Sequence, residues 1–88
     1  MSTIYKYPVG DVGEVFELEM PQGAQILDVQ LQDGKPVMWA LVDEKAPLDR
    51  RLFMIYGTGW ALPGAYGQYV ATFQTPPFVW HLFEVTNA

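Results

Sequence analysis

Residues 56–67 read YGTGWALPGAYG, in which four glycines and a proline stand among aromatic side chains. Gly57 and Gly59 leave the backbone N–H groups around them open to the close approach of an anion. Thr58 adds a hydroxyl group, and the indole of Trp60 can stack on a flat ring. The segment therefore has the groups needed to bind a phosphate joined to an aromatic base.

The glycine pattern matches neither of the common nucleotide-binding motifs. A dinucleotide fingerprint starting at Gly57 would need glycine where Leu62 stands, and a Walker loop in this segment meets Ala65-Tyr66 where Lys-Ser/Thr is required. In both motifs a helix follows the glycine loop, whereas residues 69–73 have the pattern of a strand. The segment is thus either a binding loop of another kind or a long connection that tucks Trp60 and Leu62 into the core.

Cationic and ring-bearing side chains elsewhere could complete a ligand site. Arg50 and Arg51 alternate along a strand, so only one of them can bind a given phosphate or carboxylate. The alternative is that both arginines are solvated at the start of the strand. Trp39 offers a second stacking surface. Tyr66 and His81 are further ligand-binding candidates.

Groups suited to catalysis are few. The only serine is Ser2 and there is no cysteine, so a nucleophile and its base would have to be a threonine and the single histidine, His81. Strand alternation places His81 on the face of Val79 and Phe83, whereas Glu84 falls on the other face. A lone histidine on an apolar strand face is more often a hydrogen-bonded core or interface residue than a general base. We expect no catalytic residue, no metal site and no cofactor.

Length and composition favour one domain over residues 1–88 that associates with itself. A chain this short buries only about 60–65% of the surface that it exposes when unfolded. Half of its residues are hydrophobic, five Phe, five Tyr and three Trp among them, and no cysteine is present to form a disulfide. Since one small core cannot hide so much apolar surface, we expect a homo-oligomer.

The charge balance excludes two classes of partner. The net charge is −5, and the only cations are Lys6, Lys35, Lys45, Arg50 and Arg51. A nucleic-acid binder needs a basic stripe, and an anionic membrane surface would repel this chain. The opening MSTIYKYPVG has no apolar run of signal-peptide length, so we expect an intracellular protein that binds neither nucleic acid nor membrane.

Apolar residues recur with a period of two, and Gly, Pro, Asp or Asn separates the runs. This pattern predicts an all-β fold, a small antiparallel barrel or sandwich of about six to seven short strands. The runs are Thr3–Tyr7, Glu14–Met20, Gln25–Gln32, Pro36–Asp43, Arg51–Gly57, Tyr66–Thr75 and Phe78–Thr86. The runs Val37–Val42 and Leu52–Tyr56 are apolar on both faces, which indicates central strands covered on two sides, either because the sheet rolls into a barrel or sandwich or because a second subunit covers it.

Asp33-Gly34 predicts a type I′ turn and hence a two-residue hairpin. Its register pairs Gln32 with Lys35, Gln30 with Val37, Asp28 with Trp39 and Leu27 with Ala40. One face then forms a core from Leu27, Val29, Leu31, Met38 and Ala40. On the other face Trp39 has polar neighbours, which is typical of an interface or a ligand wall, or of an aromatic lying on an exposed sheet.

Several segments resemble a family of short, uncharacterised proteins carried by bacteriophages and prophages, and the likeness covers nearly the whole chain. The segments are Ile4–Tyr7, Met20–Gln30, Trp39–Asp43, Tyr56–Gly59, Tyr69–Gln74 and Val79–Glu84. The family is a domain of unknown function, so it assigns no residue a role. The resemblance implies a phage origin and a setting in the host cytoplasm.

These observations together predict a phage-encoded anti-defence protein. We expect a homo-oligomer that sequesters a nucleotide-derived immune signal, of the cyclic nucleotide or cyclic ADP-ribose type, without cleaving it. Trp39 and Trp60 would stack on bases, the backbone at Gly57–Gly59 would hold phosphate, and Arg50 or Arg51 would supply charge. The alternatives are a phage inhibitor that blocks a host or defence protein by protein–protein contact, and a minor virion or assembly component.

Overall fold

The computed structural model describes residues 1–85 and is all-β over that range. Thr86, where the last predicted strand ends, lies outside the described residues. Within residues 1–85 no helix is long and apolar enough to cross a membrane. The strands are β1 (Ser2–Pro8), β2 (Phe16–Pro21), β3 (Gln25–Gln32), β4 (Lys35–Asp43), β5 (Leu48–Gly57), β6 (Gln68–Thr75) and β7 (Phe78–Val85).

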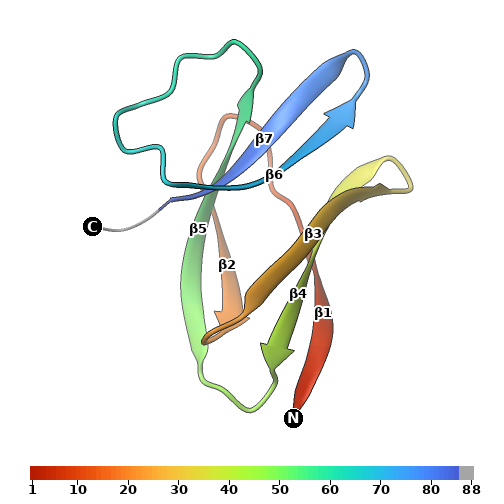
Figure 1. The fold of residues 1–88 in the computed structure, drawn as a ribbon, viewed down its shortest axis with the longest axis vertical. Helices are drawn as coiled ribbons and strands as arrows, with labels where there is room; N and C mark the ends of the chain where they lie inside the picture. Colours follow the sequence, from red (N-terminus) through yellow and green to blue (C-terminus); the bar gives the residue numbers. More distant parts are fainter. Residues whose placement is uncertain (86–88) are drawn as a thin grey trace.

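The strands form two antiparallel sheets (Figure 1). The first has three strands in the order β1-β4-β3, and the second has four in the order β2-β5-β7-β6. The sheets pack face to face as a small open sandwich and do not close into a barrel, so the all-β prediction is confirmed in its sandwich form. The connection from residue 58 to residue 67 forms a wide loop beyond the end of β5 (Figure 1).

The core lies between the two sheets. Phe53 and Ile55 of the central strand β5 are fully buried, as are Met38 and Ala40 of the central strand β4. Met20, at the end of β2, is also fully buried. Alternate residues of each strand point inward, which is why the period of two in the sequence predicted the fold.

The β3–β4 hairpin follows the predicted turn, but its register changes at a bulge. Asp33 and Gly34 both have positive φ, 53° and 78°, as a type I′ turn requires. The register shifts between Ile26 and Asp28, so that Ile26 and not Leu27 lies opposite Ala40. The extra residue of the bulge could not be foreseen from alternation alone.

This bulge corrects the predicted core face. Val29, Met38 and Ala40 are buried as expected, whereas Leu27 is 46% exposed and Leu31 is 39% exposed. Leu27 is not in the core because it is the extra residue of the bulge, and Leu31 lies next to the exposed turn. Ile26 packs against the core instead.

The two central strands differ in how their second face is covered. On β5, Tyr56 is only 6% exposed because the loop after β5 lies over that face. On β4, Leu41 is exposed and Trp39 is half-buried, so the chain itself covers only one face of this strand, and covering of the other face by a second subunit stays a prediction. β5 also begins at Leu48, earlier than its predicted start at Arg51.

Candidate functional site

A tight turn at the start of the loop positions Trp60. The N–H of Trp60 donates to the carbonyl of Gly57 at 3.1 Å, and Gly59 has a φ of +88°. A positive φ at the third residue alone is the pattern of a type II turn. The indole lies directly on Gly57, where an added Cβ would be 2.7 Å from Cε2 and Nε1 of Trp60. Gly57 is therefore needed because no larger residue leaves room for the ring.

Trp60 separates two cavities at this end of the sandwich. Its ring packs edge-on against Trp80, with 5.8 Å between ring centroids and 83° between ring planes. The cavity on the side of Phe78, which we call the hairpin cavity, has a volume of about 370 Å³. The cavity on the side of His81, which we call the loop cavity, has a volume of about 210 Å³. Gly57, Thr58 and Trp60 line both.

The alternative interpretation placed Trp60 and Leu62 in the core, but the loop does not pack there. Trp60 is 46% exposed and Leu62 is 43% exposed. Both side chains stand at the rim of the loop cavity, where a ligand could reach them. The side chains of this segment are therefore accessible at the surface.

His81 links the loop to β6 through a chain of hydrogen bonds. Its Nε2 lies 2.8 Å from Oγ1 of Thr58, and its Nδ1 lies 3.0 Å from Oγ1 of Thr72. The hydroxyl of Tyr69 lies 2.9 Å from the same Oγ1 of Thr72. The hydroxyl of Thr58 also donates to the carbonyl of Val79 at 3.2 Å. Two elements that are far apart in sequence are therefore joined by one polar chain.

For a neutral imidazole, one proton arrangement satisfies every member of this chain. Tyr69 donates to Thr72, Thr72 donates to Nδ1 of His81, and Nε2–H donates to Thr58. In this arrangement the partner of Nδ1 is a neutral hydroxyl and not the carboxylate of a Ser-His-Asp triad.

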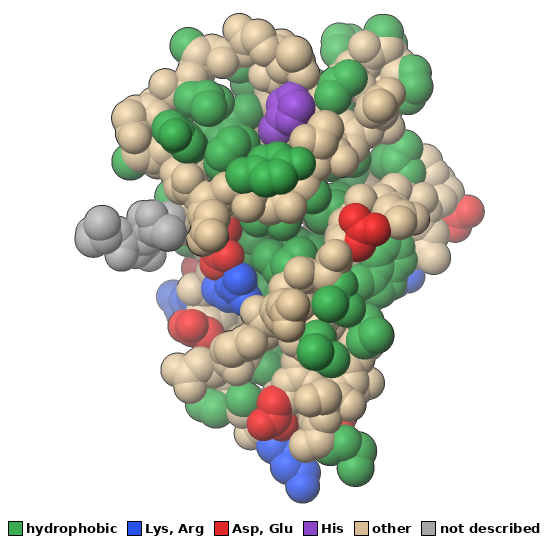
Figure 2. Space-filling model, viewed as in Figure 1, with side chains coloured by type: hydrophobic (Ala, Val, Ile, Leu, Met, Phe, Trp, Pro, Cys, Tyr) green, Lys and Arg blue, Asp and Glu red, His purple; other side chains and the backbone are tan. Residues whose placement is uncertain are grey.

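Aromatic rings cover the outer face of the four-stranded sheet beside His81. Phe83 is packed edge-on by three tyrosines, at centroid distances of 5.5 Å to Tyr56, 5.6 Å to Tyr66 and 5.7 Å to Tyr69. Hydrophobic side chains surround the histidine on this face (Figure 2). Tyr66 packs against Phe83, and Phe83 lines the loop cavity.

The structure thus brings together most of the predicted site. The residues that line the loop cavity include Gly57, Thr58, Gly59, Trp60 and His81. The sequence interpretation missed Trp80 and Thr72. The signal for Thr72 was Pro76-Pro77. A two-residue turn there pairs β6 with β7 so that Thr72 lies opposite His81, as observed.

The two arginines lie elsewhere, around a cavity of about 500 Å³. Arg51 donates to both carboxylate oxygens of Glu84 at 2.7 Å and to the carbonyl of Ala24 at 2.6 Å. The hydrogen bond to Glu84 raises the pKa of Arg51 above its ordinary value, against the lowering effect of partial burial. Arg51 is therefore engaged within the fold. Arg50 is exposed and lies opposite Glu19 of β2.

Trp39 is also remote from the loop. It lies on the outer face of the three-stranded sheet, directly opposite Lys6 on one side and Asp28 on the other. The loop cavity adjoins the outer face of the other sheet. Within one chain, Trp39 and Trp60 therefore cannot stack on the same base.

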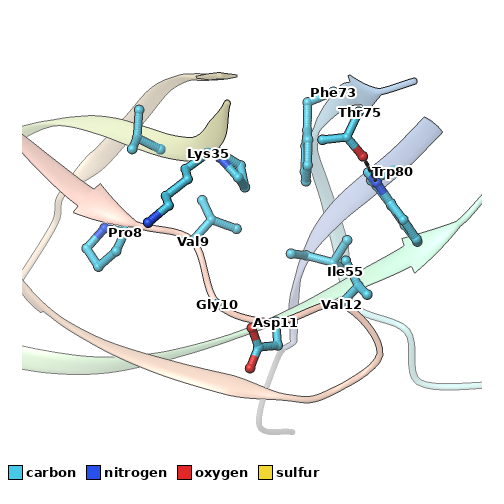
Figure 3. Close-up of a pocket in the computed structure, with 12 residues that line it drawn as sticks. Pro8, Val9, Gly10, Asp11, Val12, Lys35, Ile55, Phe73, Thr75 and Trp80 are labelled. Atoms are coloured by element: carbon cyan, nitrogen blue, oxygen red, sulfur yellow. Dashed lines mark hydrogen bonds between the residues drawn. The ribbon is translucent and has the colours of Figure 1, made fainter. Parts of the chain in front are cut away.

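Another cavity, with a volume of about 510 Å³, opens between the two sheets. Figure 3 shows the rings of Phe73 and Trp80 beside it, with the side chains of Val9 and Ile55. The indole N–H of Trp80 donates to Thr75 at 2.7 Å. Trp80 therefore forms part of the wall of this cavity and of the hairpin cavity.

Among residues 1–85, no three His, Asp or Glu side chains lie together in a way that could hold a metal ion. A family model described as a domain of unknown function, DUF7352, matches residues 1–88. No curated protein and no solved structure matches the chain. The function must accordingly be argued from the geometry of the site.

Proposed function

The chain belongs to the DUF7352 family, and we propose that it is a non-catalytic binding protein that sequesters a nucleotide-derived molecule. In this proposal a phage encodes the protein, which acts as a homo-oligomer in the host cytoplasm and withholds a defence signal without cleaving it. The loop cavity and the hairpin cavity together form the site.

The observation that carries this proposal is the position of Trp60. Its half-exposed ring is held edge-on by Trp80 and backed by Gly57, with open space beside it. A fixed and accessible indole is a stacking platform for a nucleobase, and such stacking contributes about 1–3 kcal/mol for each base. The hydroxyl oxygen of Thr58, oriented by Val79 and His81, keeps one lone pair that can accept a hydrogen bond from the base edge or the ribose.

The phosphate part of the ligand would be bound less strongly than the base. The N–H groups of Thr58 and Trp60 are already bonded within the fold, to the carbonyls of Val79 and Gly57. Of the described residues, no lysine or arginine lines either cavity. The hydroxyl of Thr58 and both ring nitrogens of His81 are also bonded within the fold. The geometry therefore supports recognition of the base and ribose more than of the phosphate.

Native mass spectrometry of protein purified from cells that make defence nucleotides tests this function. We expect the protein to carry a nucleotide that is released intact by denaturation. Trp60→Ala should lose the ligand, whereas Trp39→Ala, which removes a tryptophan from the other sheet, should retain it. Release of a cleaved nucleotide would contradict sequestration, and equal retention by both variants would contradict the site.

A second candidate is an inhibitor that docks on a host or defence protein. The observation that favours it is a group of exposed aromatic side chains at the same end of the sandwich: Phe78 at 58%, Tyr69 at 56%, Trp60 at 46% and Tyr66 at 43%. Exposed aromatic residues are typical centres of protein interfaces. A protein that stays empty when offered cyclic nucleotides and ADP-ribose derivatives would favour this candidate.

A further inference from the structure

The cavity of about 510 Å³ between the two sheets, which we call the inter-sheet cavity, has no part in the proposed nucleotide site. Its volume lies within the range of small-molecule sites, about 300–1,000 Å³. Trp80 lines both this cavity and the hairpin cavity, whereas no residue lines both this cavity and the loop cavity. The inter-sheet cavity can therefore hold a ligand of its own.

The walls of the inter-sheet cavity are apolar. Ile55 is fully buried and Phe73 is 6% exposed, and both belong to the core of the sandwich. Val9 packs against the same core and lines the cavity on another side (Figure 3). The indole N–H of Trp80 already donates to Thr75. A ligand with an apolar body suits such walls, because the walls stabilise it by burying its apolar surface.

Two charged side chains line the cavity, Lys35 at the start of β4 and Asp11 in the connection after β1. The side chain of Lys35 runs past Val9 and ends near Pro8, whereas the carboxylate of Asp11 points away from the aromatic rings (Figure 3). Within residues 1–85, neither of the two forms an ion pair. The positive charge of Lys35 is thus available to a ligand.

A second ammonium group lies close to Lys35. The Nζ of Lys6 donates to the side chain of Gln32 at 2.8 Å, and Gln32 is directly opposite Lys35 on the neighbouring strand. Asp33, in the turn before Lys35, does not line the cavity. Two of the five Lys and Arg residues of a chain with a net charge of −5 therefore gather at this end of the cavity. This local excess of positive charge favours an anionic group there.

We propose that the inter-sheet cavity is a second ligand site, which binds a small amphipathic anion with a ring-sized apolar body and one carboxylate head group. The body lies between Val9 and the ring of Phe73, and the head group pairs with Lys35. Asp11 selects against a second negative charge, because like charges brought together weaken binding. This inference goes beyond the proposed function, since the site and the class of ligand are different.

Naphthalene probes with one body and three head groups test the site. They are 2-naphthoate, the uncharged 2-naphthamide and the cationic 2-naphthylmethylammonium. Each would be titrated to about 2 mM into isotope-labelled protein and followed by NMR, which detects dissociation constants of about 1 mM. 2-Naphthoate should bind about threefold more tightly than 2-naphthamide, and the cation should bind most weakly. Nuclear Overhauser effects should join the naphthalene protons to Ile55 and Phe73.

Variants assign the head group to Lys35. Lys35→Met keeps an unbranched apolar chain but removes the charge, so the affinity for 2-naphthoate should fall to that for 2-naphthamide, and the amide should change by no more than about twofold. Asp11→Asn should tighten 2-naphthoate about two- to fivefold. Lys45→Met, on an exposed loop, is the matched control and should change neither affinity. The NMR spectrum of each variant shows whether it is folded.

Binding of no probe, or equal affinities for 2-naphthoate and the cation, would overturn the inference. So would a preference for 2-naphthoate that persists in Lys35→Met, or naphthalene contacts with Trp60 and Tyr69 in place of Ile55 and Phe73. Failure of the proposed function is distinct. A protein that binds 2-naphthoate between the sheets but carries no nucleotide would contradict only sequestration, and Trp60→Ala, which should lose the nucleotide, should still bind 2-naphthoate.

Discussion

At the scale of single residues, the site depends on the absence of a side chain at position 57. The Trp60 ring occupies the space that any Cβ there would fill. Gly57 and Trp60 are also the two ends of one turn, joined by a backbone hydrogen bond. The conformation of the turn and the position of the indole are therefore coupled, and a change at Gly57 must move the ring.

Gly57→Ala should displace Trp60 and abolish nucleotide retention with little effect on the rest of the fold. The reason is the 2.7 Å approach of the new Cβ to the indole, which only movement of the ring can relieve. Tryptophan fluorescence and native mass spectrometry would detect the two effects. Gly64→Ala is the matched control, because no atom lies within 4 Å of a Cβ at that position. Unchanged fluorescence in Gly57→Ala would contradict the packing described for Trp60.

Thr72→Val should free Nδ1 of His81 and lower the free energy of unfolding by about 1 kcal/mol, as expected for one lost hydrogen bond. Valine keeps the branched shape that suits a strand, so the backbone should be unaffected. Urea denaturation measures the stability. Since His81 is the only histidine, its imidazole ¹⁵N resonances need no assignment and report its tautomer.

The control for this prediction is Tyr69→Phe, which removes only the outermost bond of the chain. It should leave the His81 resonances close to those of the parent protein. Identical tautomer populations in the parent protein and Thr72→Val would show that Thr72 does not orient the imidazole.

At the scale of secondary structure, one ion pair ties three elements together. Arg51 of β5 reaches Glu84 of β7 through two hydrogen bonds and reaches Ala24, between β2 and β3, through a third. The side chains of Arg51 and Glu84 are only 20% and 24% exposed. Partial burial and bidentate geometry make this pair stronger than an ordinary surface ion pair.

Arg51→Met should lower the free energy of unfolding by about 2 kcal/mol, a value that allows for the partial exposure of the pair. Glu84 would be left without its partner and Ala24 without its donor. The free energy of unfolding of Arg51→Lys should lie between those of the parent protein and Arg51→Met. Lysine keeps the positive charge but cannot form the two parallel hydrogen bonds that the guanidinium group forms with a carboxylate. Urea denaturation would test the series. Arg50→Met, on the neighbouring exposed residue, should change stability by no more than about 0.5 kcal/mol.

At the scale of the whole molecule, stability should depend on protein concentration. If copies of the chain associate, as the proposed homo-oligomer requires, association stabilises the folded state by mass action. The midpoint of thermal unfolding should then rise as the protein is concentrated. Differential scanning calorimetry at several concentrations would measure it. A midpoint independent of concentration in the parent protein would contradict the homo-oligomer.

The amino-acid sequence by itself determined the strands and the position of the first hairpin. Alternation of apolar and polar residues follows from the period of two in a strand, and Asp33-Gly34 suits the positive φ of its turn. These are local properties, so they could be predicted without knowing which strands meet. The cluster of Gly57, Thr58, Gly59 and Trp60 was predicted for the same reason, because its members are neighbours along the chain.

Only the tertiary structure decided which distant residues share a site. Arg51 was a ligand candidate until the pairing of β5 with β7 brought Glu84 to its guanidinium group. Trp39 was placed with Trp60 by residue type, yet Trp39 lies on the three-stranded sheet and Trp60 lies in the loop that connects β5 and β6 of the other sheet. Thr58 and His81 are 23 residues apart, and their contact depends on strand order. Strand order is set by the packing of whole faces against each other, which no local pattern in the sequence contains.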